Sequence, residues 1–241
     1  MQNLKILLSV LILMLVMSQA NFAQNKTLKG NGNVVKKHID TGTFSELEID
    51  GIYNVYLSQG NKESVEIYFD ENLQEIVSVS NKNHQLNIHW KDGYTINEYT
   101  KMEVYITLTK IDKLDIDGVG NIYCQNTLHL NDLKLELEGV GNTKLNIVCH
   151  DLSANVAAVG NINFEGKATN FTIENSGVGN LRAYDFIAQN TKVNSSGIGN
   201  VEIYAQKNLN IDCSGIGNIR YKGNPEVVNI EKDGIGKVEK M

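Results

Sequence analysis

The chain has 241 residues, of which 41% are hydrophobic and 21% are charged, with 21 glycines and 1 proline. This composition is typical of a folded protein rather than a disordered one. The formal net charge of −6 argues against nucleic-acid binding through a general basic surface, and 3 cysteines at irregular spacing argue against a disulfide framework.

The first residues predict a secretory signal peptide. Lys5 precedes an apolar run over residues 6–17, and small residues follow it. The run is shorter than the ~20 apolar residues that a membrane span needs, so we expect cleavage near Ala20 or Ala23 rather than an uncleaved anchor. We therefore assign residues 1–23 to the signal peptide. No integral membrane segment is expected after cleavage, and the location is expected to be extracytoplasmic: periplasm, outer surface or secreted.

The rest of the chain, 24–241, is expected to form one domain whose N-terminal half, 24–110, is irregular. Gly30–Asn33 and Gly51–Asn54 resemble rough copies of a motif that recurs later. The 67 residues from Asn54 to Asn121 leave room for about three further turns with longer loops. Apolar residues at every second position in this region predict half-buried strands.

The C-terminal half, 111–241, repeats a Gly-x-Gly-Asn motif. Counted from the second glycine, the steps are 21, 19, 19, 20, 18 and 19 residues, and such a fixed period is the mark of a solenoid. In the last copy Lys237 replaces the asparagine, and in the third Ala158 replaces the first glycine. The predicted turn residues are Gly118, Gly120, Asn121, Gly139, Gly141, Asn142, Gly160, Asn161, Gly177, Gly179, Asn180, Gly197, Gly199, Asn200, Gly215, Gly217, Asn218, Gly234 and Gly236.

Short alternating apolar runs flank each motif, and no amphipathic helix pattern of useful length is present. One such unit cannot bury its own apolar face, whereas stacked units close a continuous core. We therefore predict an all-β protein, a single-stranded, right-handed parallel β-helix with coils of about 20 residues. Nine to eleven coils would make a rod of roughly 45–55 Å.

The motif suits a sharp corner. Glycine reaches positive φ without steric cost, and asparagine tolerates the left-handed region. Stacked asparagines are expected to form an amide ladder, with each side chain donating to the next coil. Two other interpretations of the glycines do not fit. A dinucleotide-binding fingerprint would need a third glycine and a following helix. A calcium-binding repeat of the β-roll type would have half this period and aspartate in the motif.

Two pairs of residues share an offset from the motif asparagine. His129 and His150 are predicted to be stacked, outward-facing neighbours, and we expect two exposed histidines rather than a metal site, which needs three or four convergent ligands. Tyr184 and Tyr204 could form a platform for a sugar ring, the alternative being an aromatic ladder that supports the sheet. The cysteines are expected to fill apolar positions. No metal or cofactor site is predicted.

No sequence signature of catalysis is visible. Asp115, Asp117, Glu136 and Glu138 are expected on adjacent coils, as in β-helices that cleave acidic polysaccharides, but basic residues are dispersed. We therefore favour a protein that is not an enzyme.

The chain resembles the family described as "putative auto-transporter adhesin, head GIN domain". The resemblance rests on the signal peptide, the run Phe44, Leu47, Ile49, Gly51, Asn54 and Val55, the strand Val65–Ile67 and the serial motif, and it covers residues 32–237. It implies a β-helix with an adhesin-like role in the cell envelope.

Our hypothesis is a secreted, non-enzymatic interaction module that presents a flat β-helix face to an extended partner, a glycan or a cell-surface protein. The alternatives are a polysaccharide-active lyase or hydrolase and a structural envelope component. The terminal coil should expose an unpaired edge. Lys232, Lys237 and Lys240 are expected to blunt this edge; the alternative is that two copies meet there.

Overall fold

The computed structural model describes residues 25–241, so the predicted signal peptide lies outside the described residues. Within this range the only helix is the short 3-10 helix η1 (Glu71–Ile76), and none is long and apolar enough to cross a bilayer. The strands up to residue 110 are β1 (Lys26–Lys29), β2 (Val34–Ile39), β3 (Glu46–Ile52), β4 (Asn54–Gln59), β5 (Ser64–Asp70), β6 (Val77–Lys82), β7 (Gln85–Trp90), β8 (Tyr94–Glu98) and β9 (Met102–Leu108).

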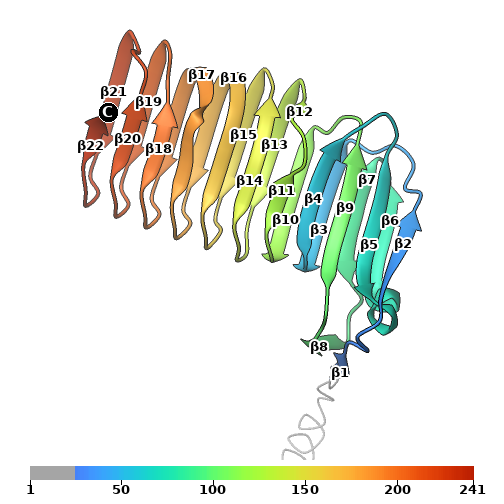
Figure 1. The fold of residues 1–241 in the computed structure, drawn as a ribbon. Coiled ribbons are helices and arrows are strands. Elements are labelled where there is room, and N and C mark those ends of the chain that lie inside the picture. Colours follow the sequence, from blue (N-terminus) through green and yellow to red (C-terminus); the bar gives the residue numbers. More distant parts are fainter. Residues whose placement is uncertain (1–24) are drawn as a thin grey trace, which may run out of the picture.

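The C-terminal part consists of strands alone (Figure 1). They are β10 (Lys113–Val119), β11 (Ile122–Cys124), β12 (Leu128–His129), β13 (Asp132–Leu137), β14 (Thr143–Val148), β15 (Asp151–Val156), β16 (Ile162–Asn175), β17 (Leu181–Ser195), β18 (Val201–Tyr204), β19 (Asn208–Cys213), β20 (Ile219–Lys222), β21 (Val227–Lys232) and β22 (Val238–Lys240).

These strands wind into a parallel β-solenoid, which confirms the predicted fold class. Strands before each Gly-x-Gly-Asn corner stack in the order β10, β13, β15, β16, β17, β19 and β21, and we call their outer surface the first face. Strands after each corner stack as β11, β14, β16, β17, β18, β20 and β22 and form the second face.

Alternation builds the core between the two faces. In β13 the residues Leu133, Leu135 and Leu137 are buried, while Lys134 points outward. On the first face the pairings between coils are parallel and in register, so each inward position stacks on the same position of the next coil; Leu135, for example, pairs with Ala154. A period of two therefore places every apolar residue of the run inside.

The number of turns is smaller than predicted. Seven corners are joined by six bridges between their middle residues, from Val119 to Ile235, and delimit about six turns of about 20 residues. The expected nine to eleven coils included three turns between Asn54 and Asn121, and that part of the prediction is wrong. Strand β10 instead stacks directly on β3, so that Gly118 pairs with Gly51.

Residues 60–112 fold to the other side of that first coil. Strand β7 pairs with β3, and β9 pairs with β4, both in parallel. The pairs β2–β5, β5–β9 and β6–β7 are antiparallel, so this region closes the N-terminal end of the sheet and adds no further turns. Apolar alternation predicts a strand but not the direction in which it pairs, which explains the error.

The N-terminal end of the core is covered. Leu73 and Ile76 of η1 are buried there. Asp70, at the end of β5, is fully buried and accepts hydrogen bonds from the backbone N–H groups of Gly32 and Thr100, both at 2.7 Å. Burial would raise the pKa of this carboxyl, but these backbone donors outweigh that effect and hold its pKa below the ordinary value. The segment Gly30–Asn33 is tied to this site and is not a coil, contrary to the prediction.

The C-terminal end is open. All six residues of β21 are exposed, including Val228 and Ile230, whose equivalents in earlier coils are buried. In Figure 1 this strand is the last of the stack, next to the C-terminus. The apolar interior of the solenoid therefore reaches solvent at this end.

Candidate functional site

The glycines stack at the corners because adjacent coils touch there through their backbones. Gly179 has a φ of 139°, and a Cβ atom built on it would overlap the carbonyl oxygen of Gly160 in the preceding coil. The same collision recurs at the second glycine of the other regular copies. Both the close approach and the positive φ exclude larger residues.

The asparagines of the motif form a ladder of hydrogen bonds along the stacked corners. This ladder begins at Asn54. Each side-chain amide donates to the Oδ1 atom of the preceding coil, as Asn200 does to Asn180 at 3.1 Å. The donors therefore point toward the N-terminal coil. In most coils the backbone N–H bonds to the same oxygen, and Lys237 ends the ladder through its backbone N–H alone.

Replacing Asn200 with alanine is expected to lower the free energy of unfolding by about 2 kcal/mol, because the side chain donates to Asn180 and accepts from the backbone and side chain of Asn218. Asn155→Ala is the control. Asn155 is exposed on the first face without a side-chain hydrogen bond in the described structure, and its loss should change stability by less than about 0.5 kcal/mol. Urea unfolding followed by circular dichroism measures both, and equal effects would contradict a stabilising ladder.

The middle position of the motif was not singled out from the sequence, yet it forms a separate surface. Its residues are all valine or isoleucine and are 38–71% exposed. We call this line of side chains the aliphatic ridge: Ile52, Val119, Val140, Val159, Val178, Ile198, Ile216 and Ile235. The constant choice of an apolar β-branched residue at a turn was the signal in the sequence. No core contact explains it, because these side chains point to solvent.

The first face carries a second ladder that sequence reasoning also missed. Asn170 donates to Asp151, Asn190 donates to Asn170 at 2.8 Å, and Asn208 donates to Asn190 at 2.6 Å. These residues pair with one another in register and so occupy the same position of successive coils. Their spacings of 19, 20 and 18 residues follow the motif period, so a search for repeats outside the glycine motif would have found them.

Three shallow depressions lie side by side on this face. Their volumes are about 430, 370 and 250 Å³. Lys192 and Asn210 line the first and third, whereas Asn194 and Asp212 line the second and third. We call the outward side chains around them the polar face: Asn155, Asn170, Thr172, Glu174, Ser176, Asn190, Lys192, Asn194, Ser196, Asn208, Asn210, Asp212, Ser214, Asn229 and Glu231.

His129 and His150 are not stacked, and that prediction is wrong. Tyr123 pairs with Lys144, an offset of 21 residues, but His129 pairs with Val148, an offset of 19. The loop between β11 and β12 therefore absorbs two extra residues and shifts His129 away from His150. Both histidines lie the same number of residues after the motif asparagine, so the sequence spacing could not reveal this bulge.

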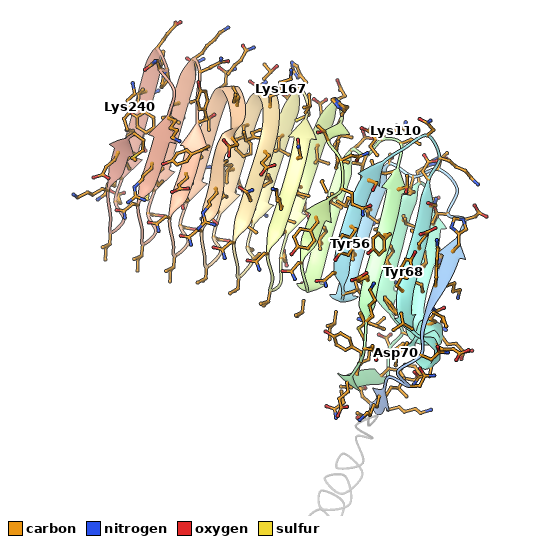
Figure 2. The ribbon with its side chains drawn as sticks, viewed as in Figure 1. Tyr56, Tyr68, Asp70, Lys110, Lys167 and Lys240 are labelled. Carbon is orange, nitrogen blue, oxygen red and sulfur yellow. The ribbon has the colours of Figure 1, made fainter. Side chains whose placement is uncertain are left out.

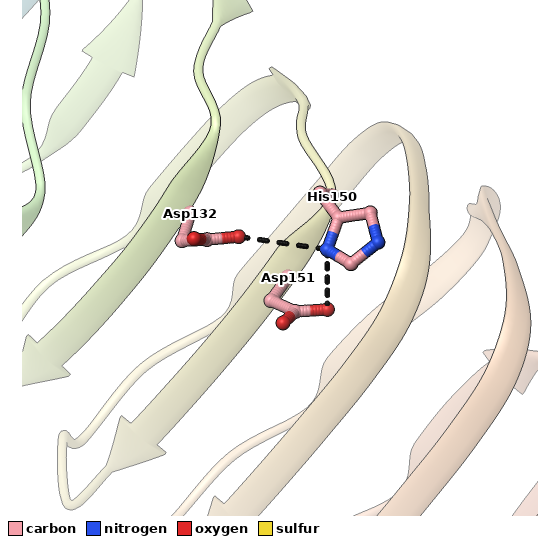
Figure 3. Close-up of side chains that lie close together, drawn as sticks. All are labelled: Asp132, His150 and Asp151. Carbon is pink, nitrogen blue, oxygen red and sulfur yellow. Dashed lines mark ion pairs between the residues drawn. The ribbon is translucent and has the colours of Figure 1, made fainter.

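His150 instead lies between two carboxylates (Figure 3). Its Nδ1 atom is 3.1 Å from Asp151 and 3.7 Å from Asp132. The three side chains are largely exposed, and the carboxylates also accept hydrogen bonds from the amides of Asn131 and Asn170. These amides and the histidine offset the repulsion between two aspartates that pair directly across adjacent strands.

Tyr184 and Tyr204 lie on the second face, in β17 and β18. The ammonium of Lys222, rather than the ring of Tyr204, covers the ring of Tyr184, at 4.2 Å from its centroid. Burial is the main cause that raises the pKa of the Tyr184 hydroxyl. A sugar platform at these tyrosines remains a prediction.

A row of stacked tyrosines lies instead near the N-terminal end of the second face, where Figure 2 labels Tyr56 and Tyr68. The ring of Tyr56 lies between those of Tyr105 and Tyr123, with centroid distances of 4.5 and 5.6 Å. Tyr68 packs edge-on against Tyr105. Because both faces of the Tyr56 ring are covered by other rings, this row stabilises the strand pairing and offers no free face there for a sugar.

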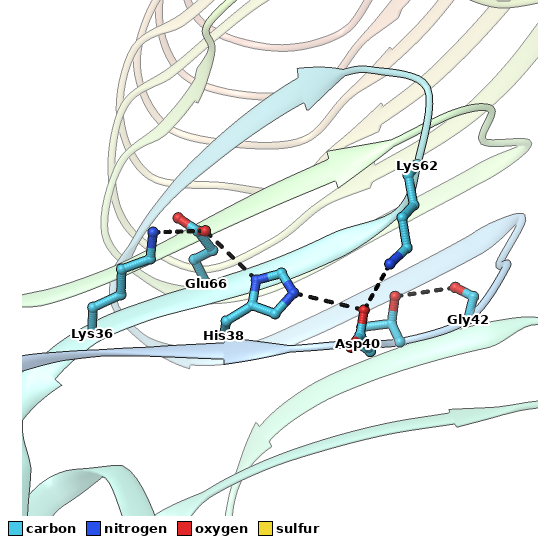
Figure 4. A network of polar contacts seen from close by, with 7 residues as sticks. Lys36, His38, Asp40, Gly42, Lys62 and Glu66 are labelled. Carbon is cyan, nitrogen blue, oxygen red and sulfur yellow. Dashed lines mark hydrogen bonds and ion pairs between the residues drawn. The ribbon is translucent and has the colours of Figure 1, made fainter.

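Beside this row, an ion-pair network covers the antiparallel edge of β2 and β5 (Figure 4). Lys36 binds Glu66 at 2.8 Å, Lys62 binds Asp40 at 3.1 Å, and His38 lies between the two carboxylates at 3.6 and 3.7 Å. The lysines depress the pKa values of Glu66 and Asp40. Charged side chains on this edge strand oppose pairing with another chain.

The three cysteines are free. Cys213 is buried, and Cys124 and Cys149 are half-buried. Burial raises the pKa of both Cys124 and Cys149 to about 11, so these thiols stay protonated and poorly nucleophilic near neutral pH.

Comparison with known families agrees with this architecture. The family model described as "putative auto-transporter adhesin, head GIN domain" matches residues 43–225. The chain belongs to this family. The match includes the first coil and most of the solenoid. A comparison with curated proteins found no match.

Solved structures share the fold of this head GIN domain protein. A "putative adhesin" from Bacteroides fragilis has a TM-score of 0.86 and 24% identity, and covers 89% of this chain and 100% of its own. A "putative lipid binding protein" from Parabacteroides distasonis has a TM-score of 0.69 and 22% identity, covering 90% and 100%. A "putative adhesin" from Parabacteroides merdae has a TM-score of 0.60 and 23% identity, covering 89% and 99%. Similarity at these identities shows the fold alone.

Proposed function

We propose that this head GIN domain protein is an extracytoplasmic, adhesin-like binding module whose polar face holds an extended glycan without altering it chemically. The three adjacent depressions on the first face carry this proposal. They are lined by amides, hydroxyls and a few charges, the groups that hydrogen-bond sugar hydroxyls. The family to which the chain belongs supports a surface-binding role.

The geometry suits a polymer better than a small ligand. Strands in one sheet are about 4.8 Å apart, so equivalent side chains recur at that spacing from coil to coil. The depressions are open and shallow, whereas small-molecule pockets enclose most of the ligand surface. An extended glycan chain would repeat the same weak contacts over several coils. Because these weak binding sites are linked, the overall affinity would be much higher than that of any one of them.

The test is a panel of immobilised and soluble glycans, with affinities measured by calorimetry. The double variant Asn194→Ala with Asn210→Ala is expected to weaken binding at least ~10-fold, because each amide contributes about 1 kcal/mol. Both side chains line the depressions and make no side-chain hydrogen bond in the described structure, so folding should be unaffected. Asn146→Ala, on the second face, is the matched control and should leave the affinity unchanged.

Other outcomes would overturn the proposal. Loss of binding in Tyr184→Ala with Tyr204→Ala, but not in the asparagine variant, would move the site to the second face. New reducing or unsaturated ends after incubation would favour a polysaccharide-active enzyme. Binding to a cell-surface protein but to no glycan would identify a different partner, and binding to neither would favour a structural envelope component.

A further inference from the structure

We propose that the aliphatic ridge is an interface between two copies of this chain, which meet ridge to ridge and antiparallel. Eight valine and isoleucine side chains follow one straight corner, from Ile52 to Ile235, over a length of about 34 Å at the usual strand spacing. A contiguous exposed apolar surface of this kind marks an interaction site more often than single exposed residues do. This site adjoins the polar face, with which it shares Ser176, Ser196 and Ser214, and it does not depend on the proposed function.

The repeat distance favours a second copy over other occupants. A partner can contact every residue of the ridge only if its own contacts recur at about 4.8 Å, and a second ridge has this spacing by construction. Every ridge residue except Ile52, which Tyr53 follows, is also flanked by residues without bulky side chains: glycine on both sides, or Ala158 on one side of Val159. Apolar side chains of the second copy can therefore approach the backbone on either side of the ridge.

The projecting part of the fold selects the antiparallel arrangement. Strands β1 and β8 pair only with each other and extend beyond the corners at the N-terminal end of the ridge (Figure 1). Parallel copies would bring both projections to the same end and into the same space. Antiparallel copies place them at opposite ends, where each projection flanks the terminal coil of the other copy.

The two ends of the ridge also complement each other. An apolar pocket of about 180 Å³ lies at the N-terminal end, lined by Ile52, Trp90, Tyr94 and Ile96 among others. At the opposite end Ile235 is 71% exposed, more than any other ridge residue. Antiparallel alignment places Ile235 of the second copy over this pocket.

The polar residues beside the ridge agree with that alignment. The exposed residues that precede each corner are acidic near the N-terminus and mostly serine near the C-terminus: Asp50, Asp117, Glu138, Ala157, Ser176, Ser196, Ser214 and Asp233. Antiparallel pairing sets Asp117 opposite Ser214 and Glu138 opposite Ser196 of the second copy. Serine hydroxyls can donate to these carboxylates, and only the outermost pair joins two acids.

Sedimentation equilibrium of the full chain over a wide concentration range tests the proposal, and we expect a reversible dimer. Val159→Glu with Val178→Glu, at the centre of the interface, should raise the dissociation constant at least ~100-fold, because carboxylates would be buried without partners. Both positions are exposed in the single chain, so circular dichroism should be unchanged. Ile187→Glu, at an aliphatic residue that is 44% exposed but off the ridge, is the control and should dimerise normally.

A charge variant tests the orientation. Ser196→Lys faces Glu138 of the second copy only in the antiparallel alignment and should tighten the dimer by about 3-fold, whereas Ser176→Lys faces Ala157 and should have little effect. A monomer at all concentrations would overturn the proposal. So would a dimer that Val228→Glu with Ile230→Glu abolishes while the ridge variant leaves it intact, because the copies would then meet through the open C-terminal coil.

Discussion

Gly179→Ala is expected to lower the free energy of unfolding by at least ~3 kcal/mol. Two costs add at this position. The backbone has a φ of 139°, which residues other than glycine adopt only with strain of order 1–3 kcal/mol. In addition, the new Cβ atom would overlap the carbonyl oxygen of Gly160, so the two coils must separate and weaken the backbone hydrogen bonds at the corner.

Ser176→Ala is the control for this substitution, since it lies at the start of the same corner and its side chain is exposed. It should change stability by less than about 0.5 kcal/mol. Urea denaturation followed by far-ultraviolet circular dichroism measures both variants. A Gly179→Ala protein with wild-type stability would show that the coils can move apart freely, and the role assigned to the second glycine would be wrong.

Ile173→Ala is expected to cost about 2–5 kcal/mol, as large-to-small substitutions in packed cores do. Ile173 is fully buried, and its neighbours in adjacent coils leave little room for collapse. The same substitution at Ile230 should cost less than about 1.5 kcal/mol, because this residue occupies the same position of the last coil and is 43% exposed.

Comparing the two isoleucines isolates the effect of burial on the free energy of unfolding, because residue type, strand position and facing direction are the same. Thermal and denaturant unfolding of both variants, with hydrogen exchange to locate the loss, provides the measurement. Equal costs would mean that the last coil is covered in solution, for instance by a second copy at the open end. Because each coil contacts only its neighbours, the loss of protection should spread from the substituted coil.

Most of the correct part of the fold prediction came from the period of the motif. Steps of 18 to 21 residues and the flanking alternation led to a parallel solenoid with the glycines at one corner. Neither feature depends on distant contacts, because a residue's side of the strand follows from its neighbours in sequence. The degenerate copy at Gly51–Asn54 was recognised in the same way, and its asparagine does start the ladder.

The errors arose where residues far apart in sequence meet. The 67 residues between Asn54 and Asn121 contain strands with the right alternation, yet they pair antiparallel and close one end of the sheet. Likewise, the equal spacing of His129 and His150 concealed a bulge that removes the expected stacking.

The aliphatic ridge and the polar face were also only partly predictable from the sequence. The aliphatic residue inside each motif was visible in the sequence, but only the structure showed that it faces solvent and forms a line. The depressions of the polar face exist because strands from several coils bring Lys192, Asn194 and Asn210 together.

The sequence by itself determined the coil, its period and the corner, since these follow from local backbone preference and from alternation along one strand. The tertiary structure alone decided which coil lies on which, where the stack is closed and which side chains share a surface. Those outcomes depend on pairing between distant strands, whose direction and register are selected by the packing of the whole sheet.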